Sequence, residues 1–322
     1  MQAAPDLSAA HSGTAIAIGG RRAGYLRRRE LAFSLLLVAP ALVLVAGIFL
    51  YPAIFTLTLS VTEFDMVRLQ IGEFVGLENY ARLFANPGFI DTIWRTIYFG
   101  LLISVAATVF GFLIALLLDQ KFAGRTVLRV VVVLPWAVPP VVAGVLWGQM
   151  FHADVGFVNA LLYRVGLIDQ YRIWLGDGWT ALHVIAIAEI WKAIPFMVLF
   201  FLAGLQSIPQ QLFEAAAVDG ATVWQRFRYV LLPLMVPIAI PLILIQFVWA
   251  MKAFDTIFVL TRGGPAGSTT TLNYLVYREA FQSFDLGRAA SAAYILLLVT
   301  LFVVLVMSIV RHYLTLRQEA TT

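Results

Sequence analysis

Four ionisable side chains interrupt the apolar segments of this sequence, and they are the first candidates for chemistry. Glu189 and Lys192 lie three residues apart inside an apolar run, and Lys252 and Asp255 are equally spaced near the end of another. Residues three apart share one face of a helix, so each pair could form an ion pair that holds helices together. Charges at membrane depth are costly and usually functional, so the same residues could instead line the path of a polar solute. Both interpretations stay open from the sequence.

Aromatic and amide side chains accompany these charges. Trp191, Trp249 and Gln246 lie within a few positions of them, and aromatic faces with a few polar groups suit sugar rings. The chain has no cysteine and four scattered histidines, so we expect no metal site. It also lacks a nucleophile elbow and an HExxH motif. We therefore expect no catalytic residue, and a membrane enzyme is disfavoured.

A nucleotide-binding loop is missing as well. ATP hydrolysis by a P-loop requires a lysine that directly follows a glycine. The three lysines of the chain, Lys121, Lys192 and Lys252, follow Gln, Trp and Met. The chain therefore holds no cofactor of its own, and an ATP-driven process would need a separate ATPase.

Composition identifies the elements that must position these residues. Of 322 residues, 61% are apolar and 12% are charged, about half the charge that is typical of soluble proteins. A chain of this kind is an all-α integral membrane protein, because only helices and closed barrels satisfy the backbone in lipid. Apolar stretches of about 20 residues or more predict six spans, at 31–59, 92–118, 127–151, 180–206, 229–257 and 289–312.

The distribution of Lys and Arg predicts the orientation. With a cytoplasmic N-terminus, the short inside segments hold more Lys and Arg than the longer outside loops, as the positive-inside rule requires. Both termini are then cytoplasmic. Residues 1–28 are predicted to be a disordered tail, 29–313 a six-helix membrane domain, and 314–322 a short C-terminal tail. The net charge of +4 is attributed to cytoplasmic loops, not to nucleic-acid binding.

The cytoplasmic loop at 207–228 carries a helix–Gly–helix pattern. Ser207 is suited to cap a helix and Pro209 to begin it, and Gln210–Val218 is rich in helix formers. Gly220 can end that helix in a left-handed conformation. Thr222 and Gln225 have the spacing of a capping box for a second short helix. Local signals alone therefore predict an elbow with small, exposed residues.

The same loop resembles the EAA loop of permease subunits of binding-protein-dependent ABC importers. That pattern is EAA, three residues, Gly, nine residues and I-x-L-P, and Val230 replaces the Ile here. The resemblance implies the type I importer permease fold and a coupling helix that docks on a separate ATPase, which binds ATP and magnesium. The implied docking residues are Glu214, Ala215, Ala216, Asp219, Gly220 and Ala221.

Residues 254–290 resemble the first permease of maltose-, trehalose- and glycerol-3-phosphate-like importers. The resemblance implies that Gly263, Gly264 and Pro265 face an extracytoplasmic sugar-binding protein. It also implies a second permease as heterodimer partner and two copies of the ATPase. The implied solute path comprises Glu189, Trp191, Lys192, Ala193, Gln246, Ala250 and Ala253. Trp249, Lys252 and Asp255 are added to it as the neighbouring aromatic and charged residues. The resemblance also makes 29–313 a permease domain in a bacterial plasma (inner) membrane.

The expected function is therefore ATP-driven uptake of a sugar by alternating access. Candidate solutes are a disaccharide such as trehalose or maltose, an oligosaccharide, or glycerol-3-phosphate. The alternative is a secondary active transporter, which would leave the elbow unexplained. Prolines at 135, 139 and 140 and at 233, 237 and 241 could be hinges for alternating access or simple curvature.

Overall fold

The computed structural model describes residues 33–34, 36–65 and 70–319, so the predicted tail at 1–28 lies outside the described residues. The chain divides into two compact units, 1–56 and 57–322. In the described part, five helices are long and apolar enough to cross a membrane, and a bent helix pair would make a sixth. The predicted all-helical membrane fold is confirmed.

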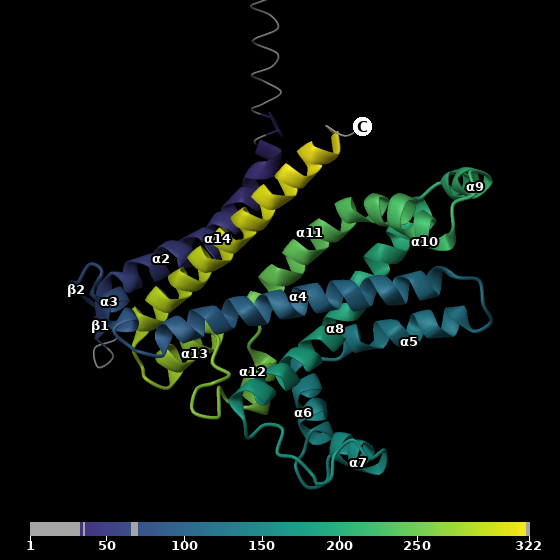
Figure 1. Cartoon of the computed structure of the whole chain (residues 1–322). Coiled ribbons are helices and arrows are strands. Elements are labelled where there is room, and N and C mark those ends of the chain that lie inside the picture. The colour runs from purple at the N-terminus through teal and green to yellow at the C-terminus, as the bar shows by residue number, and fades with distance from the viewer. Residues whose placement is uncertain (1–32, 35, 66–69, 320–322) are drawn as a thin grey trace, which may run out of the picture. The chain divides into compact units, whose positions relative to one another are not determined.

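The elements follow one another along the chain as Figure 1 labels them. Their bounds are η1 Ala46–Leu50, α2 Tyr51–Ser60, β1 Thr62–Asp65, β2 Gln70–Phe74, α3 Glu78–Phe84, α4 Phe89–Asp119, α5 Arg125–Ala137, α6 Pro140–Met150, α7 Phe157–Arg164, α8 Gly178–Ser207, α9 Gln210–Val218, α10 Val223–Arg226, η2 Phe227–Leu231, α11 Leu232–Met251, α12 Asp255–Leu260, α13 Leu272–Phe281 and α14 Leu286–Glu319. The η elements are π-helical turns that continue into α2 and α11.

In the unit 57–322, the core is built on α4, which packs against α8 and α11. The contact face of α4 carries small residues four apart at Ala107, Gly111 and Ala115, all buried. Small residues at this spacing let two membrane helices approach closely. A methyl group at Gly111 would lie 2.3 Å from Cβ of Met197 on α8. The two helices are therefore in direct backbone-level contact at this point.

The third predicted span, at 127–151, is not one straight helix. The structure breaks it into α5 and α6, which meet at an angle of 102°. Val138 and Pro139 are extended between them, with ψ values of 123° and 142°. Each of the two precedes a proline, and this position disfavours the helical conformation. The consecutive prolines therefore bend the chain, and α6 begins anew at Pro140.

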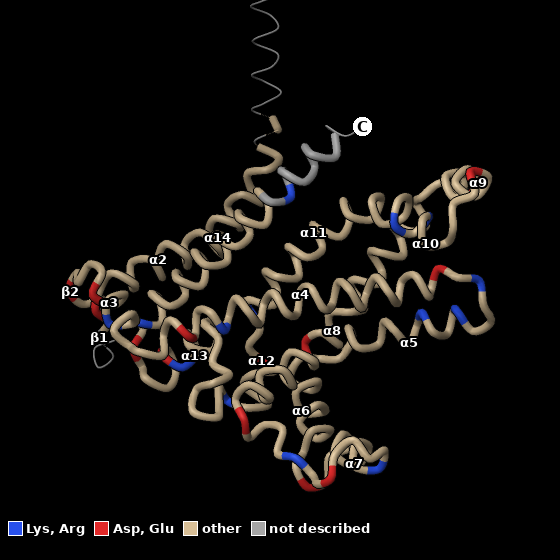
Figure 2. Tube along the Cα trace, in the orientation of Figure 1, with Lys and Arg blue, Asp and Glu red and all other residues tan. Residues whose placement is uncertain are grey.

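The fifth span also ends earlier than predicted. α11 stops at Met251, Lys252 caps it, and α12 starts at Asp255. Lys252 and Asp255 therefore belong to different elements, and the prediction that they share one helix face is wrong. Figure 2 shows no charged residue along α11 or in the middle of α14. At the C-terminus, α14 continues as helix to Glu319.

The outer segments are more ordered than the sequence indicates. Strands β1 and β2 form an antiparallel pair that was not predicted. Asn79 on α3 donates hydrogen bonds to the carbonyls of Ser60 and Thr62 at 3.1 and 3.0 Å. Asn159 on α7 is buried, and its amide donates to three carbonyls of the 152–172 segment and accepts from Trp174 Nε1 at 2.8 Å. Single buried amides thus organise both loops.

Candidate functional site

The elbow between α8 and α11 has the geometry that its sequence predicts. Gly220 is left-handed, with φ of +79°. The Ala221 amide donates to Ala216 O at 2.9 Å and the Gly220 amide to Ala217 O at 3.1 Å, which is the Schellman pattern at a helix end. The Thr222 amide donates to Gln225 Oε1 at 2.7 Å, and Gln225 N donates to Thr222 Oγ1 at 3.3 Å. The predicted left-handed stop and capping box are confirmed.

The start of the elbow differs from the prediction. α8 continues through Ser207, whose hydroxyl donates to Gly204 O at 2.7 Å. Pro209 is extended and occupies the cap position, so α9 begins at Gln210. Ser207 is therefore the end of one helix and not the cap of the next. Only two residues, both extended, separate α8 from α9, so the elbow follows directly after α8 in the chain.

The surface of the elbow is apolar as well as small. Val218, Val223 and Trp224 are 88%, 76% and 67% exposed, and Glu214 is exposed beside them. The Trp224 ring stacks on Phe227 at a centroid distance of 5.4 Å, which holds the indole in place. Large apolar residues in a loop between spans are a signal of docking, and this signal adds Trp224 to the residues named from the EAA pattern.

A small hollow lies between α8 and α11. Glu189, Lys192 and Ala193 line it from α8, and Gln246, Trp249 and Ala250 line it from α11. Both sets follow helical i, i+3, i+4 spacing, so each forms one stripe. The hollow has a volume of about 160 Å³. Six of the ten predicted path residues are therefore brought together by the structure.

Two aromatic residues complete the hollow and were missed from the sequence. Phe196 continues the α8 stripe one turn beyond Lys192, and its ring lies 4.7 Å from that of Trp249 between centroids. Extending the i, i+3, i+4 stripe to i+7 would have found it. Trp136 comes from α5, and no sequence signal connects that helix with the hollow.

Polar groups of the hollow are left with unused hydrogen-bonding capacity. Gln246 is 5% exposed, and its Oε1 has no hydrogen-bond partner in the described part of the chain. A buried acceptor without a partner costs about 1–3 kcal/mol. A solute hydroxyl or a water molecule at this position would remove that cost.

Neither of the two ion pairs that the sequence left open is formed in the described part of the chain. Among the described residues, no ion pair joins Glu189 to Lys192 or Lys252 to Asp255. Glu189 instead accepts a hydrogen bond from the hydroxyl of Thr256, a buried residue of α12. This contact links α8 with α12 and was not predicted, because the two residues are 67 positions apart.

The remaining predicted path residues lie away from the hollow. The Trp191 ring packs edge-on against Trp147 of α6 at 5.9 Å. The Lys252 carbonyl accepts from Asn273 Nδ2 at 2.7 Å. Ala253 packs against a buried cluster that includes Phe99 of α4 and Ile257 of α12, and Asp255 begins α12. None of these four lines the hollow.

The Gly263–Pro265 turn belongs to a closed loop that is fastened to α4. The Gly263 carbonyl accepts from Thr269 N at 3.2 Å and from Thr270 Oγ1 at 3.3 Å. Arg95 of α4 donates to the carbonyls of Gly267 and Thr270 at 3.2 and 2.9 Å. The loop is therefore held in one conformation by both its own residues and α4.

Comparison with known proteins identifies the family of the chain. Residues 107–319 match the model of the family described as the binding-protein-dependent transport system inner membrane component. The chain belongs to this family. It is 37% identical over 262 residues to the trehalose/maltose transport system permease protein MalF of Thermococcus litoralis, covering 81% of this chain and 86% of the relative. It is 36% identical to the sn-glycerol-3-phosphate transport system permease protein UgpA of Pectobacterium atrosepticum, over 82% of this chain and 89% of the relative.

A solved structure shows the same fold. A bacterial ABC transporter involved in the import of the acidic polysaccharide alginate has a chain that matches with a TM-score of 0.76 and 25% identity, covering 92% of this chain and 99% of that one. The predicted resemblance and the importer permease fold are confirmed. The chain is a multi-pass inner membrane permease component of a binding-protein-dependent ABC importer, and the secondary-transporter alternative is not supported.

Proposed function

We propose that the chain pairs with a second permease to form the path for uptake of a sugar, driven by two copies of a separate ATPase. The observation that carries this proposal is one continuous helix. α8 lines the hollow through Glu189, Lys192 and Phe196 and passes within two residues into the exposed elbow. A partner that moves the elbow would therefore move the wall of the hollow.

The partners follow from what the chain lacks. The hollow of about 160 Å³ is smaller than the roughly 300–1,000 Å³ of ligand pockets, which favours a second permease that supplies the rest. The sequence has no P-loop lysine, so ATP and magnesium belong to the ATPase that would receive α9. The positive-inside distribution supports a cytoplasmic side for this elbow and both termini. The 261–271 loop would then lie outside, where an extracytoplasmic binding protein would deliver the solute.

The solute class rests on the hollow and on the relatives. Two aromatic rings at 4.7 Å, a buried amide and two charged groups suit a sugar or a sugar-like polyol. The relatives are named for trehalose or maltose and for sn-glycerol-3-phosphate, and one for sulfoquinovosyl glycerol. A disaccharide, an oligosaccharide or glycerol-3-phosphate are therefore the solutes to test.

The test of this function is solute uptake by the assembled complex in proteoliposomes. Uptake should require internal ATP and the binding protein and should persist when an uncoupler removes the proton gradient. Purification of the chain should also retain a second permease and an ATPase. Uptake that survives ATP depletion but collapses with the uncoupler would contradict the proposal and favour a secondary transporter.

The hollow gives a residue-level prediction. Trp249→Ala should raise the KM for uptake about two- to tenfold, because aromatic contacts contribute about 0.5–1.5 kcal/mol. Trp191→Ala removes an indole of equal size that faces Trp147 instead and serves as the matched control, with KM unchanged. The assay is initial-rate uptake at equal amounts of reconstituted complex. An equal KM shift in both variants would contradict this position for the solute.

A further inference from the structure

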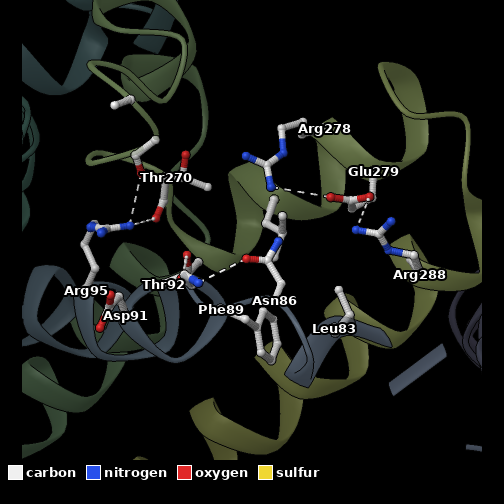
Figure 3. A pocket seen from close by; sticks show the side chains of 14 residues that line it. Leu83, Asn86, Phe89, Asp91, Thr92, Arg95, Thr270, Arg278, Glu279 and Arg288 are labelled. Carbon is white, nitrogen blue, oxygen red and sulfur yellow. Dashed lines mark hydrogen bonds and ion pairs between the residues drawn. The ribbon is translucent and has the colours of Figure 1, made fainter. Parts of the chain in front are cut away.

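A second pocket lies at the end of α4 opposite the elbow. Its volume is about 280 Å³, and α4, the 266–270 loop, α13 and the start of α14 line it. Figure 3 shows three arginines, Arg95, Arg278 and Arg288, around this pocket. Each arginine comes from a different helix. The acids that line the pocket are Asp91, which is exposed, and Glu279.

Glu279 anchors two of the arginines. Its side chain is 2% exposed, and its carboxylate lies 3.4 Å from Arg278 Nη2 and 3.1 Å from Arg288 Nη2. In addition, Arg288 Nε lies 3.9 Å from Asp285 Oδ2. The guanidinium groups of Arg278 and Arg288 therefore share one buried carboxylate. The charge of Arg288 is the better neutralised, because Asp285 also lies near it.

Arg95 is held without a carboxylate. Its Nη1 donates to the carbonyls of Gly267 and Thr270, which are neutral acceptors. In the described part of the chain, Arg95 makes no ion pair. These bonds fix the guanidinium against the loop, and the carboxylate that acts on its charge is that of Asp91, four residues earlier on α4.

Arg278 uses few of its hydrogen-bond donors within the described part of the chain. A guanidinium carries five N–H donors, and Arg278 uses one of them, at 3.4 Å to Glu279. Its side chain is 35% exposed, so the other donors are accessible from the pocket. Planar arginine forks bind carboxylates in a bidentate manner. A carboxylate that enters from outside would therefore meet unused donors of Arg278.

We propose that this pocket receives an acidic side chain of the extracytoplasmic binding protein, with Arg278 as its main partner. The inference rests on the proposed function, which places this end of α4 outside. A single carboxylate fits a pocket of 280 Å³ whose walls are fixed by Glu279 and Arg95. A lipid phosphate is the competing occupant. We favour the binding protein because the 266–270 loop, which forms one wall of the pocket, directly follows the predicted binding-protein contact at Gly263–Pro265.

The experiment titrates the complex in nanodiscs of phosphatidylcholine alone with its solute-loaded binding protein and measures stimulated ATPase activity. Arg278→Gln should raise the half-maximal concentration of binding protein about fivefold or more and weaken its dependence on salt, with basal ATPase unchanged. Arg278→Lys keeps the charge without the planar guanidinium, and its half-maximal concentration of binding protein should fall between those of the unaltered complex and Arg278→Gln. Arg164→Gln on α7 removes an exposed arginine outside the pocket and is the matched control.

The outcomes separate the possibilities. If Arg278→Gln behaves as Arg164→Gln, the pocket does not receive the binding protein and the inference is overturned. If the effect of Arg278→Gln appears only after phosphatidylglycerol is added, the occupant is a lipid phosphate and the inference is likewise overturned. If the unaltered complex is not stimulated by the binding protein at all, the proposed function itself fails.

Discussion

Gly220→Val should reduce ATP-driven uptake at least tenfold while leaving the amount of protein in the membrane unchanged. Gly220 has φ of +79°, a conformation that costs a β-branched residue about 1–3 kcal/mol. Apart from its chain neighbours, no heavy atom in the described part of the chain lies within 4 Å of an added Cβ, so the first carbon of a new side chain meets no steric contact there. The strain therefore acts on the turn between α9 and α10, and it would misdirect the surface proposed to dock on the ATPase.

The control for this prediction is Gly220→Asn. Asparagine enters the left-handed region far more readily than valine, so this variant should retain most of the uptake. Reconstituted complexes should be compared for uptake and for binding-protein-stimulated ATPase activity. Normal coupling in the valine variant would show that the left-handed stop at Gly220 is not needed for docking.

Gly111→Ala should lower the apparent Tm of the purified protein by about 5 °C or more. In a helix this change alone is worth about 1 kcal/mol in favour of alanine, yet the new methyl group would lie 2.3 Å from Met197 Cβ and 3.4 Å from the Met197 backbone. Relief requires α4 and α8 to separate, and overpacking of this kind costs about 1–3 kcal/mol or more. The thermal shift is measured in detergent by tryptophan fluorescence.

Gly148→Ala is the matched control on α6. Its added methyl group would meet only the end of the Leu260 side chain, at 3.3 Å, which can move at little cost. Its Tm should therefore stay equal or rise. Equal losses in both variants would mean that the small-residue stripe at Ala107, Gly111 and Ala115 does not set the distance between α4 and α8.

Features with a local cause were predictable from the sequence. The elbow depends on Gly220 and on the Thr222–Gln225 box, and both act within a few residues through backbone hydrogen bonds. The apolar spans depend on length and composition, which any folded arrangement in lipid must respect. The bend at Pro139 was visible as a pair of prolines, but its angle of 102° was not, because sequence alone left hinge and curvature equally open.

Pairings across the fold were not predictable in the same way. The i, i+3 rule correctly placed Glu189 with Lys192 on one stripe, but it failed at Lys252 and Asp255, because α11 ends between them. The contact from Thr256 to Glu189 and the bonds from Arg95 to the 266–270 loop join residues 67 to 175 positions apart. Periodicity carries no information over such separations.

The sequence by itself therefore determined the class of the protein, its apolar spans and the elbow, since each follows from local propensity or from transfer of apolar residues into lipid. Only the tertiary structure decided which side chains share a hollow and which do not. It brought Trp136 and Phe196 to Trp249, turned Trp191 away, and gathered Arg95, Arg278 and Arg288 around one pocket. The physical reason is that close packing of α4 against α8 and α11 fixes the rotation of each helix about its own axis, and this rotation selects the residues that meet.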